Sequence, residues 1–206
     1  MVVDTAHVEP IIDEDLQRDF FTACCDADLL EIERLASNDK VDIDKRKVKS
    51  MGGRTCADRT ALTQAVCDKK FNVVKTLLHV GANCNKTDFW GQTPLYWASG
   101  TGDLETVISL VEHGADVNIQ RKDGWAALHE AAFYNHVEIC RFLLASGADP
   151  LLKSESGDSA HQVALLNNCH ECASALNISK PQRSRMRWQR LLQIVGPNYS
   201  KLLPAK

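Results

Sequence analysis

The chain has 206 residues, of which 44% are apolar and 25% charged, and its formal net charge is −3. This is the composition of an ordinary globular chain, long enough for one extended domain or two small ones, and the overall charge does not suggest a nucleic-acid-binding protein. No signal peptide and no apolar run of the ~20 residues needed to span a membrane is visible, and eight cysteines are scattered along the chain. We therefore expect a cytoplasmic and/or nuclear protein with reduced thiols.

The two ends of the chain have opposite charges. Residues 1–44 contain thirteen acidic residues and three basic ones, whereas residues 179–206 contain seven basic residues and no acidic one. Such an asymmetry favours different neighbours for the two ends. We expect an acidic N-terminal tail over residues 1–12 and a basic C-terminal tail over residues 179–206.

The first folded unit is expected after the acidic tail. Residues 20–44 fit a pattern of two short helices that ends in Val41–Asp42–Ile43–Asp44. Residues 45–54 then form a basic stretch that contains glycine. We predict that this stretch is an insertion loop. Asp44 and the corresponding Asn85 are 41 residues apart, whereas equivalent residues in the rest of the chain are 33 apart.

That spacing is a fixed period of 33 residues, the distance along the chain from Gly81 to Gly114. Glycine, leucine and alanine recur at this interval in four independent sets. The sets are Gly81/Gly114/Gly147, Leu62/Leu95/Leu128/His161, Ala65/Ala98/Ala131/Ala164 and Gly91/Gly124/Gly157. Four sets of anchors with one period indicate an internal repeat whose units stack on one another.

Each repeat has the pattern of two helices joined by a turn. At the start of the first helix, Thr93 can cap the backbone, and the missing N–H of Pro94 costs nothing there. Apolar residues then recur on one face of a second helix over residues 104–113, which Gly114 can end in the left-handed conformation. The next repeat follows the same pattern, although Ala126 replaces the capping threonine.

The motifs Gly91–Gln92–Thr93–Pro94–Leu95, Gly114–Ala115–Asp116–Val117–Asn118 and Leu128–His129–Glu130–Ala131–Ala132 resemble those of the ankyrin repeat family. The resemblance covers roughly residues 55–176, and residues 20–44 resemble a further, degenerate repeat. It implies an all-α solenoid of stacked helix-turn-helix units with hairpin loops. The implied ankyrin repeat domain covers residues 13–178, with repeats at about 16–44, 55–87, 88–120, 121–153 and 154–178.

The resemblance also implies a function. Ankyrin repeat proteins usually bind protein partners on a concave face lined by the loop tips and the first helices. We therefore expect a non-catalytic adaptor or regulatory binder that is monomeric and takes no small-molecule substrate.

The pattern does not support other chemistry. Cys169 and Cys172 have the spacing of a zinc-binding pair, but no second pair of ligands lies nearby in the sequence. The segment 100–102 is rich in glycine, but it lacks the strand and the lysine of a phosphate-binding loop. No serine or cysteine stands in a recognisable nucleophile motif. We expect no enzyme activity, no metal and no cofactor.

Aromatic residues gather at the expected surface of two adjacent repeats. Such side chains bury ~150–250 Å² each and often dominate binding energies. Trp90 or Trp125 could instead brace its own loop, and Trp97 is expected in the core. The predicted partner-binding residues, with the polar residues beside them, are Phe89, Trp90, Gln92, Lys122, Asp123, Trp125, Phe133 and Tyr134.

Asn118 is a second candidate site. Leu110 stands eight residues before it, and Asp116 and Val117 stand just ahead of it. This is similar to the sites modified by the asparaginyl hydroxylase that also acts on hypoxia-inducible factor. The resemblance implies hydroxylation of Asn118, with an unmodified turn residue as the alternative.

The basic tail has the pattern of an amphipathic helix. Trp188, Leu191, Leu192 and Val195 share one face, and Arg183, Arg185, Arg187 and Arg190 lie mostly elsewhere. Such a helix can cap the last repeat, or it can bind a calmodulin-like partner, an acidic membrane surface or phosphate, and the two roles can coexist.

Two other functions could act through the ends of the chain. A ubiquitin-ligase substrate adaptor is one, although residues 202–204 resemble a SOCS-type box only faintly. Nucleic-acid binding through residues 45–54 and 183–190 is the other, and it is disfavoured by the overall charge.

Overall fold

The computed structural model describes residues 12–46, 50–51, 54–55 and 58–177. Within these residues ten helices form five antiparallel pairs, which confirms the predicted all-α solenoid of stacked helix-turn-helix units. The pairs are α1 (Glu14–Asp26) with α2 (Leu29–Ala36), α3 (Ala61–Cys67) with α4 (Phe71–His79), α5 (Pro94–Thr101) with α6 (Leu104–Glu112), α7 (Ala127–Phe133) with α8 (Val137–Ala145), and α9 (Ala160–Leu166) with α10 (His170–Leu176).

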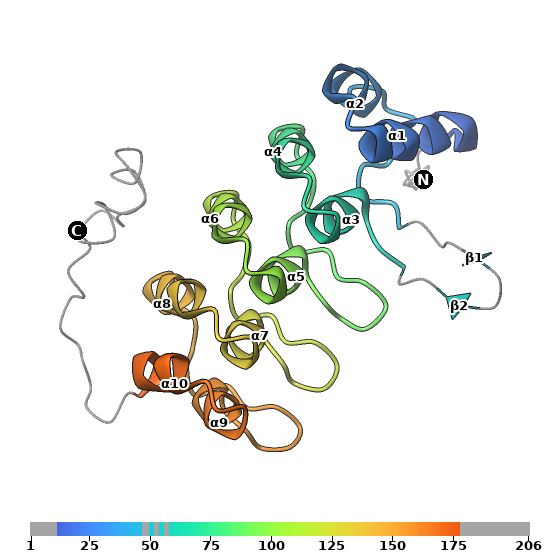
Figure 1. Cartoon of the computed structure of the whole chain (residues 1–206). Coiled ribbons are helices and arrows are strands. Elements are labelled where there is room, and N and C mark those ends of the chain that lie inside the picture. Colours follow the sequence, from blue (N-terminus) through green and yellow to red (C-terminus); the bar gives the residue numbers. More distant parts are fainter. Residues whose placement is uncertain (1–11, 47–49, 52–53, 56–57, 178–206) are drawn as a thin grey trace, which may run out of the picture.

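The pairs stack side by side into two rows. The odd-numbered helices form one row and the even-numbered helices the other, and the loops that precede α5, α7 and α9 project from the odd-numbered row (Figure 1). One continuous core runs between the rows. It includes the periodic leucines Leu62, Leu95 and Leu128, which are almost fully buried.

Part of the predicted insertion loop is paired. β1 (Ser50–Met51) runs antiparallel to β2 (Arg54–Thr55), with Ser50 opposite Thr55 and Met51 opposite Arg54. These two strands were not predicted within the insertion loop expected over residues 45–54. Two-residue strands are too short to show alternation, and the Gly-Gly dipeptide between them, a favoured hairpin sequence, was the available signal.

Side-chain caps set the starts of the first helices. Thr93 Oγ1 accepts a hydrogen bond from Tyr96 N–H (3.1 Å), and Thr60 and Ser159 cap α3 and α9 in the same way. Ala126 has no oxygen to offer, so α7 begins without this bond. Instead the N–H of Ala126 donates to His129 Nδ1 (3.2 Å), which is half of a capping box.

No helix within the described residues is both long and apolar enough to cross a membrane.

Candidate protein-interaction surface

Three five-residue hairpin loops project beside one another. Each is closed by a backbone bond, for example from Arg121 N–H to Trp125 C=O (2.8 Å). Neighbouring loops are also joined, by a bond from Lys122 N–H to Trp90 C=O (3.2 Å) and one from Glu155 N–H to Asp123 C=O (2.9 Å). Because backbone bonds fix the loops, the loop-tip side chains have defined positions.

Gly124 makes this close stacking of loops possible. Its φ is +80°, a region that favours glycine, and a Cβ atom at this position would lie 2.9 Å from the carbonyl oxygen of Lys153. The scaffold therefore requires glycine here, whereas the loop-tip side chains are free to vary.

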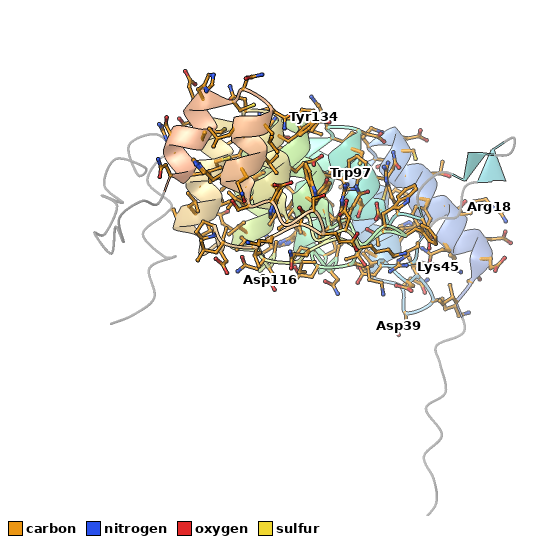
Figure 2. All side chains as sticks on the ribbon, turned by 90° about the horizontal axis from the view of Figure 1, so that it is seen from below. Arg18, Asp39, Lys45, Trp97, Asp116 and Tyr134 are labelled. Carbon is orange, nitrogen blue, oxygen red and sulfur yellow. The ribbon has the colours of Figure 1, made fainter. Side chains whose placement is uncertain are left out.

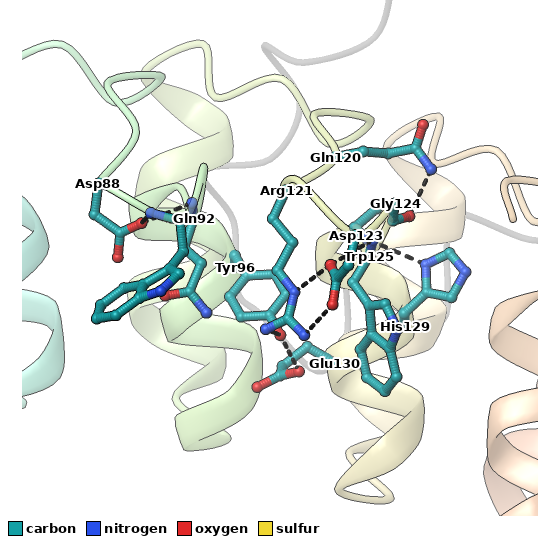
Figure 3. A network of polar contacts seen from close by, with 12 residues as sticks. Asp88, Gln92, Tyr96, Gln120, Arg121, Asp123, Gly124, Trp125, His129 and Glu130 are labelled. Atoms are coloured by element: carbon teal, nitrogen blue, oxygen red, sulfur yellow. Dashed lines mark hydrogen bonds and ion pairs between the residues drawn. The ribbon is translucent and has the colours of Figure 1, made fainter. Parts of the chain in front are cut away.

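Arg121 holds the two middle repeats together. Its guanidinium donates to both oxygens of Asp123 (2.5 Å each) and to the Tyr96 hydroxyl (2.8 Å), as Figure 3 shows. Its Cζ also lies 5.2 Å from the centre of the Tyr96 ring and 5.4 Å from that of Trp125. An arginine held in this way by a bidentate pair and two rings is well ordered.

Glu130 completes this network from α7. The Tyr96 hydroxyl donates a hydrogen bond to a carboxylate oxygen of Glu130. Burial raises the pKa of Glu130, although the bond from Tyr96 and the charge of Arg121 act in the opposite direction. Burial and the bond to Glu130 also raise the pKa of Tyr96, and the hydrogen bond from Arg121 lowers the pKa of Asp123.

Gln92 does not belong to the exposed site, so this part of the prediction was wrong. Its side chain is buried, and its backbone N–H donates to Asp88 Oδ1 (2.9 Å). In the side-chain amide orientation that satisfies both neighbours, its nitrogen donates to Asp88 Oδ2 (3.0 Å) and its oxygen accepts from Arg121 Nη1 (3.1 Å). The residue that closes the loop faces the helices, whereas the residues at the tip face solvent.

Trp97 is only partly buried, so the prediction that it lies in the core was also wrong. It packs against the core from outside, and its indole N–H donates to Asp88 Oδ2 (3.2 Å). The Arg59 guanidinium lies 4.2 Å from the centre of its ring. An indole suits a position that is apolar on one side and polar on the other. The neighbouring Tyr96, and not Trp97, is the aromatic residue that α5 buries.

Four of the five predicted aromatic residues are exposed. The exposed fractions are 60% for Phe89, 45% for Trp90, 38% for Phe133 and 53% for Tyr134. Trp125 is partly buried. We call these five residues the aromatic surface.

The aromatic surface consists of two groups of rings. Phe89 and Trp90 meet edge to face with ring centres 5.8 Å apart at one loop tip. In the next repeat, the ring of Phe133 lies between those of Trp125 (5.8 Å) and Tyr134 (4.9 Å). Tyr134 lies at the edge of the array opposite Asp116 (Figure 2).

Polar and charged side chains connect the two groups. Lys122 is exposed and places its Nζ 4.2 Å from the centre of the Phe89 ring, and Arg121 lies over Trp125. Asp123 is held by Arg121 and has little freedom to bind anything else. Trp125 also contacts His129, with ring centres 5.9 Å apart, so it braces its own repeat at the base of the second group.

Asn118 lies on the exposed side of the segment that links two repeats. Its side-chain nitrogen donates to Gly147 C=O (3.2 Å), and its side-chain oxygen accepts from Asp149 N–H (2.8 Å). Asn85 makes the same pair of bonds one repeat earlier. The candidate hydroxylation site is thus a residue that bridges neighbouring repeats.

The candidate metal pair is not assembled into a site. Cys172 is fully buried with its Sγ 3.7 Å from Cys140 Sγ, and burial raises the pKa of both thiols. Within the described part of the chain, no three His, Cys, Asp or Glu side chains are arranged to hold a metal ion. The candidate tail residues Arg183, Arg185, Arg187, Trp188 and Arg190 lie outside the described residues.

Sequence reasoning did not find the network of Tyr96, Arg121 and Glu130. The available signal was positional, because Arg121 occupies the place of Asp88 one repeat later and Tyr96 occupies the place of His129 one repeat earlier. A change of residue type at an equivalent position of the next repeat therefore indicated that these two repeats contact each other through different side chains.

Known proteins match most of the repeat array. The family model described as ankyrin repeats (3 copies) matches residues 62–154 and 121–183, which together make up more than half of the chain. The SH3 and multiple ankyrin repeat domains protein 2 of Homo sapiens is 35% identical over 118 residues, which are 57% of this chain and 6% of that protein. The ankyrin repeat and SAM domain-containing protein 6 of Rattus norvegicus is 38% identical over 100 residues, which are 48% of this chain and 11% of that protein.

A shorter relative is matched over most of its length. The Notch-regulated ankyrin repeat-containing protein B of Danio rerio is 37% identical over 100 residues, which are 46% of this chain and 90% of that protein. The two longer relatives are matched only over a small part of their length. The relatives and the repeat geometry agree, and the chain belongs to the ankyrin repeat family.

Proposed function

We propose that this chain is a non-catalytic adaptor or regulatory binder, located in the cytoplasm and/or nucleus, that holds a protein partner on the aromatic surface. Ankyrin repeats generally mediate protein–protein interactions. The observation that carries the proposal is the exposure of Phe89, Trp90, Phe133 and Tyr134 on two adjacent repeats. Clustered apolar exposure that folding does not use marks an interaction site.

The area involved is large enough to matter. Covering the exposed part of one such ring contributes on the order of 2–3 kcal/mol before the cost of association. Two or three rings covered together would therefore dominate the affinity of a partner. The backbone bonds between loops fix the tip positions in advance, which reduces the ordering cost of binding.

The free polar groups of the surface are hydrogen-bond donors. The indole N–H groups of Trp90 and Trp125, the hydroxyl of Tyr134 and the Nζ of Lys122 have no hydrogen-bond partner among the described residues. The nearby carboxylates are already used, since Asp88 accepts from its own loop and Asp123 pairs with Arg121. Such a surface favours an extended segment that offers carbonyl oxygens, and a carboxylate for Lys122.

Selection from a displayed library of natural disordered segments tests this proposal. We expect the full chain to enrich segments that combine apolar anchors with acidic residues. Lys122→Glu should lose the acidic preference, and Trp90→Ala with Tyr134→Ala should lose the enrichment. Leu30→Ala, which changes an exposed leucine on α2 at the far end of the array, is the matched control.

Two outcomes would count against the proposal. One is that the wild-type chain enriches no segment above background. The other is that the aromatic variant enriches the same segments as Leu30→Ala. The ubiquitin-ligase and membrane alternatives, and most of the nucleic-acid alternative, depend on residues outside the described part.

A further inference from the structure

The outer face of the last repeat exposes positions that are buried in every earlier repeat. Val66, Ser99 and Ala132 occupy one such position and are at most 2% exposed, whereas Leu165, the next residue in this series, is 49% exposed. Gln162 is likewise exposed, whereas the equivalent residues of the three preceding repeats, Thr63, Tyr96 and His129, are buried. In the earlier repeats the following first helix covers these residues, for example α9 over α7.

The exposed positions on this face are partly apolar. Leu165, near the end of α9, is the large apolar residue among them, and Ala175 on α10 is only partly buried. A terminal repeat that ends an array in water normally has a polar outer face. A half-exposed leucine at a position that stacking buries in the earlier repeats indicates that something else covers this end.

The chain itself supplies a suitable cover. It continues to Lys206 after Asn177, the last described residue, which directly follows α10. The stretch from Asn177 to Trp188 can reach about 35 Å when extended, well beyond the ~10 Å width of a helix. Because the segment is tethered to the face, its effective concentration there is high.

Charge and pattern also fit. The last repeat, over residues 154–177, carries Glu155, Asp158 and Glu171 and no lysine or arginine. The continuation has seven basic residues and no acidic one from residue 179 onward, with apolar residues at helical spacing between Trp188 and Val195. Opposite charges and matching apolar residues favour this segment over a neutral or acidic partner.

We propose that residues 181–206 cover the outer face of the last repeat, with the apolar residues of 188–195 against Leu165 and the arginines toward the acidic side chains. The segment then serves as the C-terminal cap of the array. This proposal does not depend on the aromatic surface, because it concerns the end of the stack and not the loop tips.

A double-mutant cycle in the full chain tests the cap. The variants are Leu165→Ser, Trp188→Ser and both together, and amide hydrogen exchange is followed by mass spectrometry in α9 and α10. Each single change should speed exchange there by about tenfold, the loss expected for one covered apolar side chain. The double variant should exchange no faster than either single variant, because both changes remove the same contact.

Exchange in α3 and α4 should stay unchanged, and Leu30→Ser, at the opposite end, should leave α9 and α10 protected. The proposal is overturned if Trp188→Ser leaves exchange in α9 and α10 unchanged, or if the two changes add. It is also overturned if protection of α9 depends on protein concentration and light scattering gives a dimer mass. A second copy would then be the cover.

Discussion

Arg121 and Asp88 stand at the same place in adjacent loops and have opposite charges. Asp88 accepts bonds from its own loop and from Trp97, whereas Arg121 donates to Asp123 and to Tyr96 of the preceding repeat. The same position of the repeat therefore makes contacts within its own repeat at Asp88 and contacts to the preceding repeat at Arg121. Asp88, Arg121 and Asp123 therefore hold the loops under the aromatic surface, whereas Lys122 stays available to a partner.

Glu130 should make stability depend on pH. Its pKa is raised in the folded state, chiefly by burial, so the folded chain binds this proton more tightly than the unfolded chain. Its contribution is full below the ordinary pKa of glutamate and is lost as pH rises through the folded-state pKa. The free energy of unfolding of wild type minus that of Glu130→Gln should therefore fall from about pH 4 to pH 8 in urea titrations. A difference that rises with pH, or stays flat, would contradict this.

Asn118→Ala should destabilise the array by about 1–2 kcal/mol, because two hydrogen bonds to the next repeat are lost. Asn118→Asp keeps the acceptor for Asp149 N–H and should cost less. Chemical denaturation of both variants measures this, and equal stability of Asn118→Ala and wild type would rule out a bridging role.

Hydroxylation of Asn118 stays a prediction. The intact mass of natively expressed protein should show one added oxygen atom, which Asn118→Ala should lack.

At the scale of single elements, the helices differ mainly at their first residues. α5 begins with a threonine cap and a proline, whereas α7 has Ala126 at its N-cap and only the bond from Ala126 N–H to His129. The equivalent positions in α3, α5 and α9 hold Thr60, Thr93 and Ser159, so the fold has room for a hydroxyl there.

Ala126→Thr should therefore stabilise the domain by about 1 kcal/mol through a new bond to His129 N–H. Ala126→Val is the matched control, because it adds the same volume without the oxygen. Thermal unfolding followed by circular dichroism should place the threonine variant above the valine variant. If the two melt together, the missing cap is not a weakness of α7.

The helices were predictable because period, caps and terminal glycines all indicated the same pairs. β1 and β2 were missed because two-residue strands leave no periodic signal. Gln92 and Trp97 were misplaced for a related reason. Sequence position gives the loop or helix of a residue, but the direction of its side chain depends on contacts such as Asp88 with Trp97.

At the scale of the whole molecule, the stack separates scaffold from surface. The repeated leucines, alanines and glycines build the array, and residues such as Phe89 and Tyr134 are not needed for it. The aromatic surface was largely predictable for this reason. The network that joins Tyr96, Arg121 and Glu130 was not, because it links residues that become neighbours only when the repeats stack.

The most direct test of the account is the affinity of the full chain for a segment selected by it, measured by isothermal titration calorimetry. Trp90→Ala combined with Tyr134→Ala should weaken the dissociation constant at least ~30-fold, the effect of losing hot-spot residues, while Leu30→Ala leaves it unchanged. Circular dichroism should confirm that both variants stay folded. If the folded aromatic variant binds within about twofold of wild type, the aromatic surface is not where this protein holds its partner.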